Sequence, residues 1–132
     1  MVSMVPFAWC AEFGSIVLHV SALASHTRAM ERHPAVGLLF SAPEPEDEGV
    51  HALERVSLQG VASTPPNGSV LHAAARASYL QRFPDAAFMT ELPDFRFVCI
   101  TPSEARHVAG FGSARDVSGN DFVSAMNFTV AP

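Results

Sequence analysis

Short apolar runs separated by turn residues occupy most of the chain, and this pattern predicts a β-rich fold. Runs of this length, either alternating or continuously apolar, are typical of strands. The predicted strands are 1–9, 15–20, 35–41, 55–63, 95–101 and 105–111. The strand at 35–41 is apolar throughout, which predicts burial on both faces. The strand at 55–63 alternates, which predicts one face toward water, and Gly60 inside it indicates a bulge or a close approach by a neighbouring group.

Two helices are predicted between the strands. Ser21 is a suitable N-cap for the first helix, which should end near His33 because a proline follows. The second, Val70–Arg82, is rich in alanine and has apolar residues at helical spacing. A short helical turn is expected over 85–89, and 113–132 reads as a loop-like tail with at most one turn of helix. The order β-β-α-β-β-α-β-β predicts antiparallel pairing in a single domain that spans the whole chain.

Composition narrows the classes of protein that fit. The 132 residues are 48% hydrophobic and 16% charged, which excludes disorder and allows a core without disulfides. So few charges also indicate that a partner covers some of the surface, and we expect a homodimer. The net charge of −5 gives no basic field for nucleic acid. All eight basic residues are arginine, which excludes a Schiff-base lysine and a P-loop lysine.

The termini and cysteines predict a cytoplasmic protein with no membrane partner. No run approaches the ~18 apolar residues of a membrane span. The first residues lack a basic region and include Glu12, so they make a poor signal peptide. Cys10 and Cys99 fit no metal-ligand spacing and are expected to be buried free thiols in a reducing compartment.

The first candidate site lies where the strand at 15–20 runs into a helix. Ser25 and Thr27 supply hydroxyls there, His26 an imidazole and Arg28 a guanidinium. A helix N-terminus with such donors is suited to a phosphate. The alternative is an ordinary capped helix with polar residues facing water, and local chemistry leaves both open. Arg55 opens the alternating strand and can pair with an anion, although its spacing alone favours a solvent-facing arginine.

Other kinds of site have less support. The six histidines are dispersed and form no HExxH pair, so no zinc site is predicted. His107 lies near Gly110-Phe111-Gly112 and is a candidate axial haem ligand. The sequence has no GxSxG motif and no cysteine with a clear histidine partner, which argues against a hydrolase. It also has no GxGxxG motif, which argues against a Rossmann dinucleotide site.

Four stretches together resemble a known family. Residues 18–40, LHVSALASHTRAMERHPAVGLLF, resemble the pyridoxamine 5′-phosphate oxidase-like split-barrel superfamily, and most closely its haem-utilisation (HugZ-like) branch, which reads S-x-L-A-x-H-T-x-N. Residues 55–62 (RVSLQGVA), 79–88 (YLQRFPDAAF) and 95–112 (FRFVCITPSEARHVAGFG) fit the same branch in the same order. The resemblance covers nearly the whole chain.

This resemblance implies a fold of mainly β with α: a six-stranded antiparallel split β-barrel of the FMN-binding type with covering helices. It implies that the family's usual N-terminal helix and first strand are lacking here. It also implies a homodimer with FMN across the subunit interface. Ser25 to Arg28 would hold the FMN phosphate, and the segment before the first hairpin turn would run along the isoalloxazine. The implied cofactor-binding residues are Val5, Pro6, Phe7, His19, Val20, Ser25, His26, Thr27, Arg28 and Arg55.

The chain also departs from the family pattern. Ala29 replaces the asparagine after H-T-x, and His33-Pro34-Ala35 replaces D-P-R. The oxidases' basic phosphate-binding pair is replaced by His26 and Thr27. The C-terminal extension of the haem-degrading members has no counterpart. The C-terminal arginine and histidine motif of the vitamin B6 oxidases is also missing, which argues against pyridoxamine phosphate as a substrate.

We therefore expect an FMN-binding split-barrel protein acting as a flavin-dependent oxidoreductase of undefined substrate, with no catalytic residue assigned. One alternative is a haem-binding or haem-utilisation protein on the same fold, with His107 as a candidate ligand. Another is a structural dimer without a cofactor. All three predict a homodimer.

Overall fold

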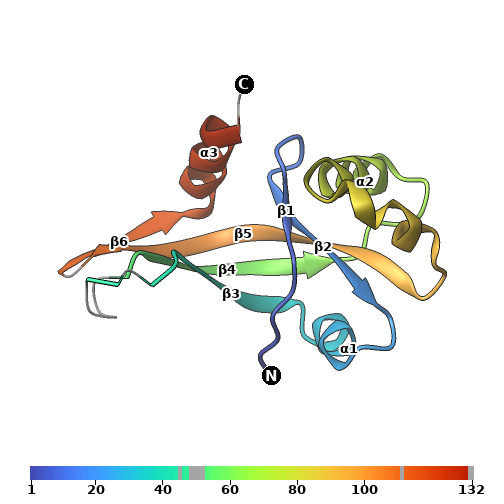
Figure 1. The fold of residues 1–132 in the computed structure, drawn as a ribbon, viewed down its shortest axis with the longest axis horizontal. Helices are drawn as coiled ribbons and strands as arrows, with labels where there is room; N and C mark the ends of the chain where they lie inside the picture. Colours follow the sequence, from blue (N-terminus) through green and yellow to red (C-terminus); the bar gives the residue numbers. More distant parts are fainter. Residues whose placement is uncertain (45, 48–52, 111, 131–132) are drawn as a thin grey trace.

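The computed structural model describes residues 1–44, 46–47, 53–110 and 112–130 (Figure 1). Within them, six strands form one antiparallel sheet with neighbour order β1-β2-β5-β4-β3, and β6 pairs with β5. The elements are β1 (Ala8–Cys10), β2 (Ser15–Ser21), α1 (Ser25–Arg32), β3 (Ala35–Ser41), β4 (Arg55–Ser63), α2 (Val70–Arg82), the 3-10 helix η2 (Pro84–Glu91), β5 (Phe95–Gly110), β6 (Ser113–Ser118) and α3 (Gly119–Val130). The predicted six-stranded antiparallel sheet with covering helices is confirmed.

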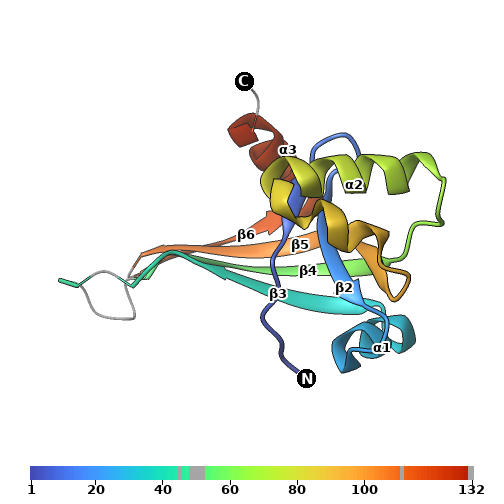
Figure 2. The ribbon, with the colours of Figure 1, turned by 45° about the vertical axis from the view of Figure 1, so that its right-hand side comes forward.

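The helices lie on different sides of this sheet. Figure 2 shows α2 and α3 on one side of the long strands and α1 on the other. The N-terminal segment, residues 1–7, crosses the strands before entering the β1–β2 hairpin (Figure 1). The sheet therefore has a covering element on each side near β2, and that strand is buried along almost its whole length.

Two hydrophobic cores form because successive side chains of a strand point to opposite faces. Leu18 of β2, Leu58 of β4 and Ile100 of β5 belong to the larger core, against which the N-terminal segment and α1 pack. Val17 and Cys99 point the other way, into a smaller core closed by α2. Ile100 and Val17 are fully buried. One strand pair, β2 and β5, thus supplies both cores.

The predictions for the first 33 residues need two corrections. The strand predicted at 1–9 is confined to Ala8–Cys10, and the residues before it are extended without sheet pairing. Pro6 lacks an N–H group, which disfavours pairing there. The helix expected to open at Ser21 begins at Ser25. Ser21 instead ends β2 opposite Phe95, and its hydroxyl accepts the N–H of Leu23 at 3.1 Å in a turn before the helix.

The strand predicted at 35–41 exists as β3, but it is not buried on both faces. Its residues alternate between exposed and half-buried along the strand. The reason is its position, because β3 is an edge strand and only one of its faces lies over the larger core.

The predicted strands 95–101 and 105–111 are one continuous strand, so the break predicted between them is wrong. Strand β5 runs through Pro102, which lies opposite Gly60 where the β4–β5 register shifts. A bulge relieves the missing N–H of proline. The bulge expected at Gly60 is confirmed, and a Cβ there would lie 2.7 Å from the Thr101 carbonyl oxygen. Phe111 lies outside the described residues.

The predicted loop-like tail is also wrong, because 113–118 form β6 and 119–130 form α3. Tertiary contacts hold this segment in place. The Trp9 indole N–H donates to Asn127 Oδ1 at 2.9 Å, and the Trp9 and Phe122 rings meet edge to face. The backbone of Gly119 passes so close to Pro102 that a Cβ would lie 2.5 Å from the Pro102 carbonyl oxygen.

Candidate functional site

An apolar groove opens over the larger core, between the N-terminal segment, α1 and β3. We call it the N-terminal groove; its volume is about 300 Å³. It continues along β3 and β4 into a wider hollow of about 910 Å³ that reaches Phe40 and Leu58. The groove is lined by Met1, Ser3, Val5, Leu18, His26, Ala29, Met30, His33, Ala35, Val36, Gly37, Leu38 and Ile100.

Two imidazoles line this otherwise mostly apolar groove. His26 lies in the first turn of α1 and is half-buried, while His33 is the exposed C-cap of the same helix. Residues seven apart lie on one face of a helix, which is why both reach the same groove. Imidazole nitrogen is a common ligand for transition metals and for haem iron. The groove therefore combines an apolar surface with metal-ligating side chains.

The N-terminus of α1 carries a second feature. Its N-cap residue, Ala24, offers no side-chain cap. Thr27, in the first turn, is only 1% exposed, and its hydroxyl has no hydrogen-bond partner among the described residues. That side chain lines a pocket of about 230 Å³ together with Ser63 and Thr64. Ser25 is exposed, and Arg28 donates from Nη2 to the Leu23 carbonyl at 3.2 Å.

The structure brings only some of the sequence-predicted residues together. Val5 lines the N-terminal groove and Phe7 its wider continuation, whereas Pro6 between them is exposed. Val20 is buried in the larger core. His19 points to the opposite face of the sheet, where its ring lies 5.2 Å from that of Phe95.

Arg55, at the start of β4, and His107, opposite Val56 on β5, lie remote from α1. Arg55 pairs with Ser41 and Val108 in the sheet, and its Nη1 donates to the Leu53 carbonyl at 3.0 Å. The His107 Nε2 lies 3.2 Å from Glu54 Oε1. Neither side chain lines the N-terminal groove.

Shifted pKa values mark the other face of the sheet. Burial lowers the pKa of His19 below its ordinary value. Burial also raises the pKa of Tyr79, against the opposing effect of the Arg82 charge. Burial, with a smaller effect from Cys10, raises the pKa of Cys99 to about 11.

The described residues contain no group of three or more histidine, cysteine, aspartate or glutamate side chains placed to hold a metal ion. None of the described helices is both long enough and apolar enough to cross a membrane.

Sequence reasoning identified His26 but missed His33 and the groove itself. The seven-residue spacing of these histidines was the available signal. This spacing indicates a shared groove only when the elements that face the helix, the N-terminal segment and β3, are known.

The antiparallel sheet, its covering helices and the groove define a split-barrel protein. The chain is 33% identical to Heme oxygenase HutZ of Vibrio cholerae over 127 residues, which cover 96% of this chain and 71% of HutZ. The chain belongs to the HutZ family. It is 39% identical over 113 residues to the chloroplastic Non-canonical heme oxygenase HOZ of Arabidopsis thaliana, covering 85% of this chain and 32% of HOZ. No protein-family model matches it.

A solved structure supports the same fold. The heme binding protein from Mycobacterium smegmatis superimposes with a TM-score of 0.81 at 30% identity, over 92% of this chain and 48% of that one. The chain thus spans about half of that protein and a third of HOZ. These three relatives are named for haem, so the haem-utilisation part of the resemblance is supported, while the FMN-binding part stays a prediction.

Proposed function

We propose that this chain binds haem in the N-terminal groove. The observation that carries the proposal is the pair of imidazoles, His26 and His33, on an apolar groove that widens along β3. The names of the three relatives, two haem oxygenases and a haem-binding protein, support the same ligand. The proposal is limited to binding, because the oxygenase names belong to proteins that this chain covers only in part.

The residues of the groove suit the group. Val5, Val36 and Leu38, all half-buried, offer apolar surface for a flat macrocycle, and burial of that surface would drive binding. His26 or His33 would supply the axial nitrogen. Bound haem would supply a redox-active iron whose properties depend on that ligand and on the apolar surroundings. The sequence-based alternative ligand, His107, pairs with Glu54 outside the groove.

A haem titration followed at the Soret band tests this proposal. The wild type should give a saturable Soret shift. His26→Ala, His33→Ala or the double variant should alter the band position or weaken binding about tenfold or more. His107→Ala serves as the matched control and should bind like the wild type. A Soret shift that is unchanged in the double variant would refute His26 and His33 as haem ligands. A shift that is lost only in His107→Ala would assign the axial ligand to His107 on β5.

The second candidate ligand is FMN, with its phosphate at the N-terminus of α1. It is supported by the uncapped helix start and by the buried hydroxyl of Thr27 without a described partner. Protein incubated with FMN and freed of excess should then absorb near ~450 nm, as flavins do. The Thr27→Val protein should retain little flavin. The Thr64→Val protein, which carries a similar change nearby, should retain more flavin than Thr27→Val. Colourless wild-type protein would end the flavin proposal and leave the haem proposal standing.

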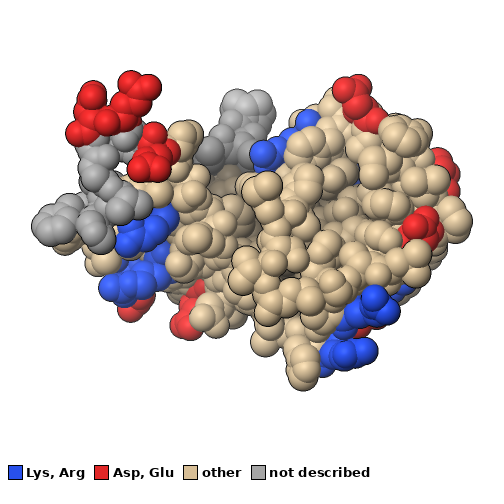
Figure 3. Space-filling model, turned by 60° about the horizontal axis from the view of Figure 1, so that its bottom comes forward, with Lys and Arg blue, Asp and Glu red and all other residues tan. Residues whose placement is uncertain are grey.

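A homodimer is part of the proposal. Apolar side chains beside the groove are strongly exposed, with Val2 at 99%, Met4 at 100% and Leu39 at 69%. Figure 3 shows a face of the molecule whose centre lacks arginine, aspartate and glutamate, with the charged residues at its margins. Large exposed apolar patches on a protein surface mark interaction sites. A second copy covering this region would also enclose whatever the groove binds.

A further inference from the structure

A second pocket lies on the opposite face of the sheet, at the corner where η2 meets β5. We call it the corner pocket; its volume is about 290 Å³. Its walls come from β2, α2, η2 and the start of β5, and it shares no lining residue with the N-terminal groove. Neither haem nor FMN, as placed above, would use it.

The corner pocket joins an aromatic wall to a cluster of hydrogen-bond donors. The His19 and Phe95 rings stack at 5.2 Å with an interplanar angle of 29°. The His72 ring meets Phe97 edge to face at 5.5 Å. The polar lining also includes Asn67, Arg76, Thr90, Glu91 and Arg96. Such a wall favours a flat apolar body, and such donors favour an acceptor group on it.

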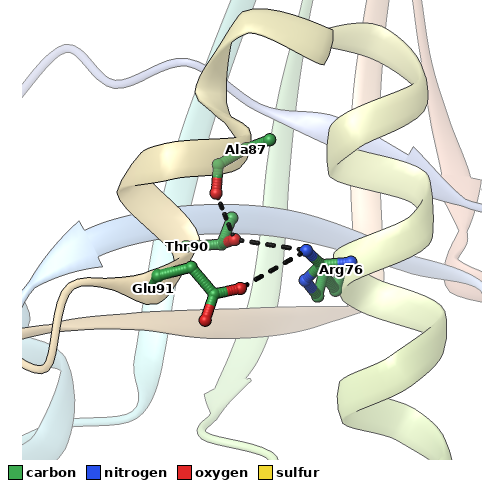
Figure 4. Close-up of polar contacts among 4 residues, drawn as sticks. All are labelled: Arg76, Ala87, Thr90 and Glu91. Carbon is green, nitrogen blue, oxygen red and sulfur yellow. Dashed lines mark hydrogen bonds and ion pairs between the residues drawn. The ribbon is translucent and has the colours of Figure 1, made fainter.

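Arg76 is held loosely by its own chain. Figure 4 shows its guanidinium on α2 directed at the end of η2, toward Thr90 and Glu91. The Nη2 atom lies 3.5 Å from Thr90 Oγ1 and 3.7 Å from Glu91 Oε1, both long for a charge-assisted contact. The Glu91 side chain is 78% exposed, so this pair contributes little to stability.

The second arginine of the corner pocket behaves differently. Arg96 Nη1 lies 2.6 Å from Glu31 Oε1 of α1, which is a short contact. Arg96 is therefore committed to a close carboxylate partner, whereas Arg76 meets only a distant one. Of the two arginines, Arg76 is therefore the one whose carboxylate partner, Glu91, a ligand can replace more easily.

We propose that the corner pocket binds a small planar carboxylate. The ligand's carboxylate replaces Glu91 on the Arg76 fork, and its flat body lies against the His19 and Phe95 rings. Arginine suits this role because its planar fork matches a carboxylate in two parallel hydrogen bonds. Glu91 acts as an internal competitor, since it occupies the same guanidinium in the free protein.

The test uses benzoate as the probe and benzamide as its neutral counterpart, followed by titration calorimetry and by amide shifts over residues 90–97. Wild-type protein should bind benzoate and shift those amides. Arg76→Gln should weaken benzoate binding about tenfold or more, because a charged hydrogen-bond pair is lost. Glu91→Gln should tighten benzoate binding several-fold and leave benzamide unchanged. Arg76→Lys keeps the charge without the fork and should fall between Arg76→Gln and the wild type.

Arg106→Gln is the control, because Arg106 also forms an exposed ion pair, with Asp116 on β5 and β6. It should bind benzoate like the wild type. Equal benzoate affinity in wild type and Arg76→Gln would overturn the proposal. So would an unchanged or weaker affinity in Glu91→Gln, a variant that keeps the guanidinium and decides the question even if Arg76→Gln folds poorly.

Discussion

Replacing Gly60 with alanine should destabilise the protein by about 2–3 kcal/mol. A Cβ at this position would lie 2.7 Å from both the Thr101 carbonyl oxygen and Ile100 Cγ2. Real Cβ contacts are not that short, so β4 and β5 must move apart at the bulge. Ile100 is fully buried in the larger core, and its displacement adds a packing defect. Gly60 has no positive φ, so the expected cost is steric.

Gly37→Ala is the matched control, one strand away on β3. Its Cβ would meet only the Leu58 carbonyl oxygen at 4.0 Å, an ordinary contact, and Gly37 also has no positive φ. Alanine there should be neutral or stabilising by up to about 1 kcal/mol, because it reduces the freedom of the unfolded chain. Urea unfolding followed by the fluorescence of Trp9, the single tryptophan, measures both variants.

For a domain of this size the Gly60→Ala cost corresponds to a Tm lower by roughly 10 °C. If Gly60→Ala unfolds at the same urea concentration as Gly37→Ala, the close approach of β4 to β5 at the bulge is wrong. An equal loss in both variants would point to a general intolerance of the sheet, and the steric reasoning at Gly60 would fail.

Three further predictions concern titration, thiol reactivity and association. Burial lowers the pKa of His19 below 6.5, so the imidazole takes up its proton at a higher pH in the unfolded chain than in the folded chain. The contribution of His19 to stability is therefore full above about pH 6.5 and falls as the pH drops below it. His19→Phe, measured by urea unfolding at several pH values, should lose less stability on acidification than the wild type, and an equal loss would contradict the assignment. Cys99, with a pKa raised to about 11, and the equally buried Cys10 should not react with a thiol reagent at about pH 8 until the chain is unfolded; rapid reaction of the native protein would exclude this packing. Leu39→Asp should convert the proposed homodimer to a monomer by light scattering, whereas Phe88→Asp, at a similar 70% exposure on η2, should not; two variants of the same mass would remove β3 from the proposed interface.

Local sequence pattern predicted much of the secondary structure. The helix at 70–82 and the strands at 35–41 and 55–63 follow from spacing, turn residues and capping that neighbouring residues encode. The errors have a common cause. Pro102 looks like a turn until Gly60 of another strand provides the bulge that accommodates it. Residues 113–130 look like a loop until Trp9 and Asn127 meet across 118 residues.

The candidate site likewise depends partly on local sequence and partly on tertiary contacts. Ser25 to Arg28 form the first turn of α1, whereas the sequence predicted that this helix opens at Ser21. His19 and Val20, which the resemblance places beside one ligand, point to opposite faces of the sheet because they are consecutive residues of β2. The N-terminal groove combines segments as distant as Val5, His33 and Ile100, and no local pattern records that they meet.

The sequence by itself determined that this chain forms an antiparallel β-rich domain with helices over its sheet, since hydrophobic period and turn chemistry act over a few residues. Tertiary structure decided which strand lies at the edge, which histidines share a groove, and which arginine contacts its carboxylate partner only at long distance. Those outcomes depend on the sheet order β1-β2-β5-β4-β3 and on packing between remote segments. The free energy of such contacts belongs to pairs of residues far apart along the chain, and no single stretch of sequence contains it.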